Sequence, residues 1–198
     1  RPIANFAPKL LGLFAFGDPL KATAKDAIKK LEQQGIATVL ISGDNLGSVS
    51  RVAEQLGMMH FYAQVLPDEK ASLVAKLKQN GGLVAMVGDG MNDAPALAAA
   101  DVGFAMSGGT DVAMHTSGVT LMRGDPALVS QAIEISQKTY QKIRQNLFWA
   151  FVYNVIGIPL AALGLLSPVV AGAAMALSSF SVISNALLLK TWKPKSGG

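Results

Sequence analysis

A long stretch without charge constrains this chain more than any other feature. From Gln145 to Leu189 the sequence contains no Asp, Glu, Lys, Arg or His. One membrane-spanning helix needs about 20 apolar residues, so the stretch is long enough for two. Ser167-Pro168 interrupts it near the middle, and we therefore expect a hairpin of two transmembrane helices, 146–166 and 169–189. The alternative is a buried helical pair in a large soluble core.

The charge distribution predicts a domain boundary just before this stretch. All 13 acidic residues lie at or before Glu134, and basic residues flank the hairpin on both sides; these are Lys138, Lys142 and Arg144 before it and Lys190, Lys193 and Lys195 after it. Positive ends on both sides favour a cytoplasmic position for both. We expect one domain over 1–135 and a membrane segment with two cytoplasmic ends over 136–198.

Composition also excludes several classes of protein. The chain has no Cys, which excludes disulfides and thiolate metal sites within it. Its basic residues do not cluster with aromatic ones, as a nucleic-acid-binding surface requires, so we expect no nucleic-acid partner. The chain begins with Arg1, and we expect it to be a piece of a longer polypeptide.

The first half alternates between helical and strand-like segments. Helical patterns cover 22–34, 45–56, 67–79 and 93–100, and apolar strand-like runs cover 36–41, 83–87, 102–106 and 119–122. Such alternation predicts an α/β fold with a Rossmann-like parallel sheet, with ligands at the carboxyl ends of the strands. Thr23 and Asp26 predict a capping box. Pro126 predicts the start of a helix that continues into the membrane.

Two places in the first half carry polar residues that can bind a phosphate. Ser42-Gly43-Asp44 comes after the strand that ends at Ile41; a hydroxyl and a free backbone amide there can hold a phosphate oxygen, although the same tripeptide is also an ordinary turn. Lys70 lies near the start of the helix over 67–79 and can neutralise a phosphoryl group. Its alternative role is that of a solvated surface lysine.

The densest cluster is Gly88-Asp89-Gly90-Met91-Asn92-Asp93, directly after the apolar run 83–87, which we expect to be a buried strand. Two carboxylates and a carboxamide are costly to gather unless a positive charge lies among them. Mg²⁺ that also holds a phosphate is the natural counter-charge. The alternative for Asp93 is a helix cap.

The hairpin carries a few polar side chains at depths where they are costly. Tyr153 and Asn154 lie in the first predicted helix, and Met175, Ser178 and Ser179 share one face of the second. A thioether suits Cu(I), whereas hydroxyl oxygens suit harder ions. Because neither helix contains Asp, Glu or Lys, a monovalent soft ion fits better than Zn²⁺ or Ca²⁺. The alternative is ordinary packing between membrane helices.

These motifs carry a family resemblance. The order of Ser42, Lys70 and the Asp89/Asp93 pair resembles the haloacid-dehalogenase-like hydrolase superfamily. The longer strings 86–97 and 100–103 resemble the hinge signature of P-type ATPases, and Asp18-Pro19 and the string 108–113 resemble other parts of their phosphorylation domain. In the hairpin, Tyr153-Asn154 and the string 175–179 resemble the copper(I)-transporting, type IB subgroup of these pumps.

The resemblance implies a function and a set of roles. It implies ATP-driven export of Cu(I) through an aspartyl-phosphate intermediate, with Asp89 as a catalytic residue that holds Mg²⁺ and Asp93 as a ligand or close to the metal. Ser42 and Lys70 would be catalytic contacts of the phosphoryl group. The phosphate site would comprise Ser42, Gly43, Asp44, Lys70 and Asn92. The Cu(I) transport site would comprise Tyr153, Asn154, Met175, Ser178 and Ser179.

Parts of the family pattern lie outside this sequence. It contains no DKTG motif, whose Asp is the family's nucleophile, and no Cys-Pro-Cys ion-binding helix. We therefore expect the second half of the phosphorylation domain, inactive alone, with most of the ATP site elsewhere in the parent protein. The resemblance implies as partners the lipid bilayer, Cu(I), the remaining segments of the parent ATPase and a copper chaperone.

Three alternatives stay open at this point. The chain could belong to a haloacid-dehalogenase-like phosphohydrolase with a membrane anchor. It could belong to a pump for another soft ion such as Ag(I), which the same ligands cannot reject. It could also be a membrane subunit without catalysis, which leaves the cluster of Asp89, Asn92 and Asp93 unexplained.

Overall fold

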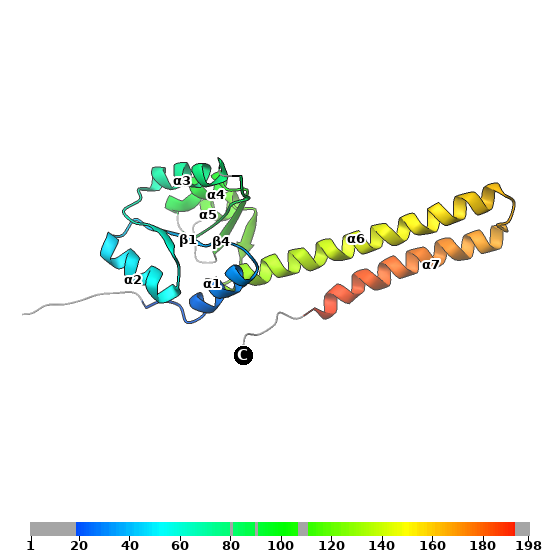
Figure 1. Ribbon diagram of the computed structural model, residues 1–198, viewed down its shortest axis with the longest axis horizontal. Helices are drawn as coiled ribbons and strands as arrows, with labels where there is room; N and C mark the ends of the chain where they lie inside the picture. Colours follow the sequence, from blue (N-terminus) through cyan, green and yellow to red (C-terminus); the bar gives the residue numbers. More distant parts are fainter. Residues whose placement is uncertain (1–18, 80, 90, 107–110, 193–198) are drawn as a thin grey trace, which may run out of the picture.

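The protein consists of an α/β domain and a long helical hairpin (Figure 1). The computed structural model describes residues 19–79, 81–89, 91–106 and 111–192. Predicted features at Asp18, Gly90, 108–110, Lys193 and Lys195 lie outside the described residues.

Short elements alternate along the α/β domain. In chain order they are α1 (Ala24–Gln33), β1 (Val39–Ile41), α2 (Leu46–Leu56), β2 (His60–Tyr62), α3 (Pro67–Gln79), β3 (Ala85–Gly88), the 3-10 turn η1 (Met91–Asp93), α4 (Ala94–Ala99), β4 (Val102–Met106), α5 (Asp111–Thr116) and β5 (Val119–Leu121).

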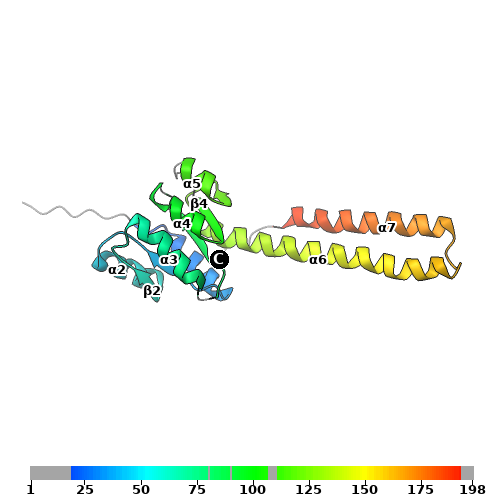
Figure 2. The ribbon, with the colours of Figure 1, turned by 90° about the horizontal axis from the view of Figure 1, so that it is seen from above.

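The three strand pairs of the described residues are all parallel, which confirms the predicted fold class. β1 pairs with β2, with Val39 opposite His60, and a second sheet has the order β3-β4-β5, with Val87 opposite Phe104. Parallel neighbours need crossover connections, which α2, α4 and α5 supply. Figure 2 shows the helices gathered around these strands.

The strand predicted at 83–87 is present as β3 (Ala85–Gly88), but the predictions that it is buried and that it begins at Leu83 are wrong. Leu83 is 93% exposed and lies before the start of β3, and Val87 is 37% exposed. Within the described part of the chain, β3 has a ladder neighbour on one side only, so its apolar side chains are incompletely covered. β1 is half-buried rather than buried and begins later than predicted, at Val39.

Helix caps explain why some boundaries follow the sequence closely. Asn45 caps α2 by accepting a hydrogen bond from the Ser48 N–H at 3.0 Å, and Gly57 ends this helix with φ of 78°. The predicted capping box at the start of α1 is wrong. The Thr23 hydroxyl makes no cap hydrogen bond and donates instead to Asp125 Oδ1 at 2.6 Å, because a tertiary partner lies within reach.

The core of the domain includes the beginning of the hairpin. Val129, in the first turn of α6 (Ala127–Ala162), is 5% exposed and packs with Phe104 of β4 and Leu121 of β5. Asp125 Oδ1 also accepts a hydrogen bond from the Ala127 N–H at 3.0 Å. The hydrogen bond from the Thr23 hydroxyl, and to a smaller extent that from the Ala127 N–H, holds the pKa of the Asp125 carboxyl below its usual value. The start of α6 is therefore fixed to the α/β domain.

The helix α6 leaves the domain and continues without a break across residues 135 and 136. After a short loop, α7 (Pro168–Leu187) returns alongside it and ends in the 3-10 turn η2 (Leu188–Thr191), as both ribbon views show (Figures 1 and 2). Among the described helices, one segment, Pro168–Thr191, is long and apolar enough to cross a membrane by length and composition. The apolar half of α6 is diluted by Gln145, Asn146 and Asn154.

Candidate functional site

The turn after β1 is built around the Ser42 hydroxyl. This hydroxyl donates to Asp44 Oδ2 at 2.9 Å and accepts from the Asp44 N–H at 3.2 Å. The turn is tied to the segment after β2, because the Ser42 N–H donates to the Tyr62 carbonyl and the Val65 N–H donates to the Ser42 carbonyl. The two interpretations of this tripeptide are therefore compatible, since a well-formed turn presents the hydroxyl at the strand end.

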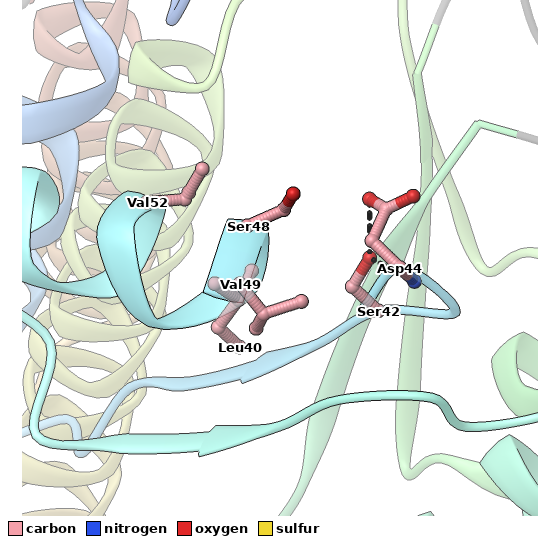
Figure 3. A pocket seen from close by; sticks show the side chains of 6 residues that line it. All are labelled: Leu40, Ser42, Asp44, Ser48, Val49 and Val52. Atoms are coloured by element: carbon pink, nitrogen blue, oxygen red, sulfur yellow. Dashed lines mark hydrogen bonds between the residues drawn. The ribbon is translucent and has the colours of Figure 1, made fainter. Parts of the chain in front are cut away.

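A small pocket opens beside this turn (Figure 3). Its lining side chains come from β1, the turn and the first half of α2: Leu40, Ser42, Asp44, Ser48, Val49 and Val52. The Gly43 N–H has no hydrogen-bond partner among the described residues. A hydroxyl and a free amide beside a pocket could bind an anion such as a phosphate oxygen.

Lys70 of α3 and Asp93, which follows β3, form an ion pair. Lys70 Nζ lies 2.7 Å from Asp93 Oδ1, and the two side chains are only 16% and 14% exposed. The alternative of Lys70 as a solvated surface lysine is therefore wrong. Asp93 is the N-cap residue of α4 but makes no side-chain cap hydrogen bond, so its carboxylate serves the lysine rather than the helix.

Gly88 allows the Asp93 carboxyl to sit against the end of β3. A Cβ built on Gly88 would lie 2.7 Å from Asp93 Cβ and 2.9 Å from Asp93 Oδ2, distances that non-bonded carbon and oxygen atoms do not tolerate. Glycine is required here by space and not by backbone conformation, since no positive φ occurs at this position.

Asp89 and Asn92 point to solvent from the same strand end. Both are exposed, and neither side chain makes a hydrogen bond or ion pair with another residue in the described part of the chain. No group of three His, Cys, Asp or Glu side chains that could hold a metal occurs among the described residues. Mg²⁺ commonly takes one or two carboxylates and completes its shell with phosphate oxygens and water, and Asp89 and Asp93 are carboxylates of the kind that this ion takes.

A second ion pair, for which the sequence predicts no role, fixes the entry to β3. Asp101 Oδ1 lies 3.1 Å from Lys78 Nζ, and Asp101 Oδ2 accepts from the Val84 N–H at 2.9 Å. The hydrogen bond from the Val84 N–H, and to a smaller extent that from Lys78, lowers the pKa of the Asp101 carboxyl. The string 100–103 was noted as part of a signature, and this was the only signal that could have pointed to Asp101.

The predicted transport residues lie on different faces of the hairpin. Tyr153 of α6 and Ser178 of α7 are half-buried, whereas Met175 is 73% exposed and Asn154 and Ser179 are also exposed. Asn154 Nδ2 donates to the Ala150 carbonyl in its own helix at 2.9 Å. No hydrogen bond joins the α6 pair to the α7 group among the described residues, so the hairpin alone does not assemble these five side chains into one site.

Sequence comparisons point to one family of proteins. The haloacid dehalogenase-like hydrolase family matches residues 2–101. A copper-exporting P-type ATPase of Staphylococcus aureus (strain bovine RF122 / ET3-1) is 55% identical over 181 residues, which cover 91% of this chain and 23% of that protein. Its counterpart in strain JH9 is 54% identical over the same shares. The chain thus spans about a quarter of the length of these curated relatives.

The likeness to solved structures also includes the hairpin. A zinc-transporting PIB-type ATPase in the E2.Pi state matches with a TM-score of 0.80 and 38% identity, over 87% of this chain and 28% of that one. The catalytic domain of the CPx-ATPase CopB-B matches with a TM-score of 0.53 and 35% identity, over 57% of this chain and 45% of that one. The first match covers more of the chain than the residues before α6, so it includes part of the hairpin.

The contact at Gly88 gives a direct test of the site's packing. We expect Gly88→Ala to displace the Asp93 carboxyl and to lower the free energy of unfolding by about 1–3 kcal/mol, the usual cost of overpacking. Gly82→Ala is the matched control, because a Cβ there meets no atom within 4 Å. Urea denaturation of both variants in detergent measures the difference. Equal stability of the two variants would contradict the close approach of Asp93 to Gly88.

Proposed function

We propose, on the premise that this chain belongs to the haloacid dehalogenase-like hydrolase family, that it is the C-terminal part of a heavy-metal P-type ATPase that exports Cu(I). The parent protein would couple ATP hydrolysis, through an aspartyl phosphate, to transport across the cell membrane. The observation that carries the proposal is the direct connection, by the single helix α6, of the domain bearing the Lys70–Asp93 site to an apolar hairpin. The identity of 54–55% to copper-exporting ATPases supports it.

The strand ends supply groups suited to phosphoryl transfer. Lys70 Nζ, held by Asp93 Oδ1 at 2.7 Å, can share its charge with phosphoryl oxygens, where negative charge builds during transfer. The Gly43 N–H can donate to the same group, and the Ser42 hydroxyl can do so once it releases Asp44 Oδ2, which accepts its one proton in this structure. Asp44 and Asn92 would lie nearby in the phosphate site. The nucleophilic Asp and the nucleotide-binding domain would come from the rest of the parent protein.

Two carboxylates of this site would hold Mg²⁺. Asp89 is exposed just after the end of β3. Asp93 Oδ1 accepts from Lys70, and Asp93 Oδ2 has no hydrogen-bond partner among the described residues. When bound, Mg²⁺ supplies further neutralisation of the phosphoryl oxygens. Asp93 therefore has a double role, since it orients Lys70 and contributes to the metal site.

The hairpin would contribute to the ion path. Its uncharged stretch offers the Met175 thioether, the carboxamide of Asn154 and hydroxyls of Tyr153, Ser178 and Ser179, a donor set that favours a soft monovalent ion. Met175, Asn154 and Ser179 are exposed in the hairpin and would meet further ligands from the parent protein's other helices. Ag(I) would satisfy the same donors.

The remaining partners follow from this arrangement. Residues 136–198 would lie in and beside the bilayer, and residues 1–135 would lie in the cytoplasm, because the flanking charges are all basic. A copper chaperone would deliver the ion to the parent protein from the same side.

The Mg²⁺ role of Asp89 can be tested in the full-length parent protein. We expect Asp89→Asn to lower Cu(I)-dependent phosphorylation from ATP by about a hundredfold, because one preorganised charge at the reacting phosphate is lost. Asp68→Asn, an exposed acid in the first turn of α3, serves as the control. Gel assays of the acid-stable phosphoenzyme measure both variants. Wild-type phosphorylation of a folded Asp89→Asn protein would remove Asp89 from the metal site.

The ion-site role of the hairpin calls for a different readout. We expect Met175→Ala and Asn154→Ala to raise the Cu(I) concentration for half-maximal ATPase activation by roughly tenfold, a usual scale for changes around a metal site. Backward phosphorylation by inorganic phosphate should stay near the wild-type level, since it uses the soluble site. Met59→Ala, at a position 87% exposed in the α/β domain, is the control. Unchanged Cu(I) dependence in both hairpin variants would refute the site.

A further inference from the structure

A polar cluster joins the two hairpin helices near the end that faces the α/β domain. It consists of Lys142, Gln145 and Asn146 of α6 and Asn185 of α7, and we call it the Asn185 cluster. Lys142 Nζ donates to Asn185 Oδ1 at 2.6 Å, and Asn185 Nδ2 donates to Asn146 Oδ1 at 2.7 Å. A longer contact of 3.4 Å joins Asn185 Nδ2 to Gln145 Oε1. These are the hydrogen bonds that link α6 to α7 among the described residues.

The chemistry of the cluster fixes the orientation of the Asn185 carboxamide. An ammonium group has no acceptor, so the atom that faces Lys142 must be the oxygen, and the amide nitrogen must face Asn146. The carboxamide oxygen and the amide nitrogen of Asn185 therefore both have a hydrogen-bond partner. Lys142 takes part in no ion pair with a described residue, and all acidic residues lie at or before Glu134. The carboxamide oxygen is therefore the ammonium group's main partner.

The rest of the interface between the helices offers little that is specific. The half-buried positions recur every three or four residues. On α6 they include Lys142, Asn146, Ala150, Tyr153 and Gly157. On α7 they include Ala174, Ser178, Ser181 and Asn185. In lipid, apolar side chains gain nothing from one another that the acyl chains do not also give, so small residues and hydrogen bonds determine which helices pair and in what register.

We infer that Asn185 is a positioning residue that holds α7 in register on α6, so that α7 follows any movement of the α/β domain. The first turn of α6 lies in the core of that domain, with Val129 5% exposed, and Lys142 lies on the same unbroken helix. At the Asn185 cluster, α6 is hydrogen-bonded to α7. Only the link between this movement and ion transport rests on the proposed function.

The position of α7 can be measured in this chain without any assay of transport. The sequence has no Cys, so cysteines introduced at Lys29, exposed on α1, and at Leu187, 54% exposed on α7, would be the only sites for spin labels. We expect one narrow distance distribution for the labelled wild-type chain in lipid nanodiscs. Asn185→Leu should raise the fraction of displaced α7 by about threefold to tenfold, as expected for the loss of a charge-assisted hydrogen bond between membrane helices.

Two further variants separate positioning from a general loss of packing. Asn185→Asp keeps an acceptor for Lys142 and should restore the narrow distribution, whereas Asn185→Asp combined with Lys142→Met should lose it again. Gln141→Leu, exposed beside Lys142, is the control and should match the wild type. A narrow, unchanged distribution for Asn185→Leu, or a failure of Asn185→Asp to restore it, would overturn the inference. These distances do not depend on transport, so a parent protein that proved not to pump Cu(I) would leave them as expected.

Discussion

The rest of the structure depends on the helix α6, a single continuous helix that passes from the core of the α/β domain into the apolar hairpin. At its start, Val129 is packed among strand residues, and Asp125 ties the first turn to Thr23 of α1. Further along, apolar side chains such as Val155 are 67% exposed, as suits a lipid-facing surface. Pro159 lies inside the helix, but close to its far end and beyond Tyr153 and Asn154. Any distortion from the missing amide is therefore placed past the polar residues, and the segment between the domain and these residues is left to act as a rigid rod.

Two lysines of α3 form ion pairs with the segments on either side of α4 in the α/β domain. Lys70 bonds Asp93 and Lys78 bonds Asp101, and these two acids flank α4 on either side. The first pair is the more buried, so the loss of one partner there would leave an uncompensated charge, which is far more destabilising than the loss of an exposed pair. Together the pairs fix α4 and both ends of β3, and Asp89 follows directly from this strand. The geometry at the proposed phosphate site thus depends on contacts made around it by α3.

The sequence allowed the soluble fold to be predicted well where local signals are strong. The bounds of α2 and α3 follow from Asn45, Gly57 and Pro67, which act within their own helices. β2 and α5 escaped prediction because each is short and lacks a clear periodicity. Thr23 shows a local signal overridden by a distant partner, Asp125. The strand-end residues could be proposed from their order, but the Lys70–Asp93 pair could not. Nor could the Asn185 cluster, because its hydrogen bonds join residues about 40 positions apart with no pattern that marks them as partners.

Under the proposed function, occupation of an ion site in the membrane controls phosphoryl transfer at the end of β3. Phosphoenzyme formation from ATP by the purified wild-type parent protein, titrated in parallel with Cu(I) and Zn²⁺, tests this claim most directly. Since the hairpin offers a thioether, a carboxamide and hydroxyls but no carboxylate, Cu(I) should stimulate phosphorylation and Zn²⁺ should not. Phosphorylation that proceeds equally without any metal, or that responds to Zn²⁺ alone, would contradict the claim.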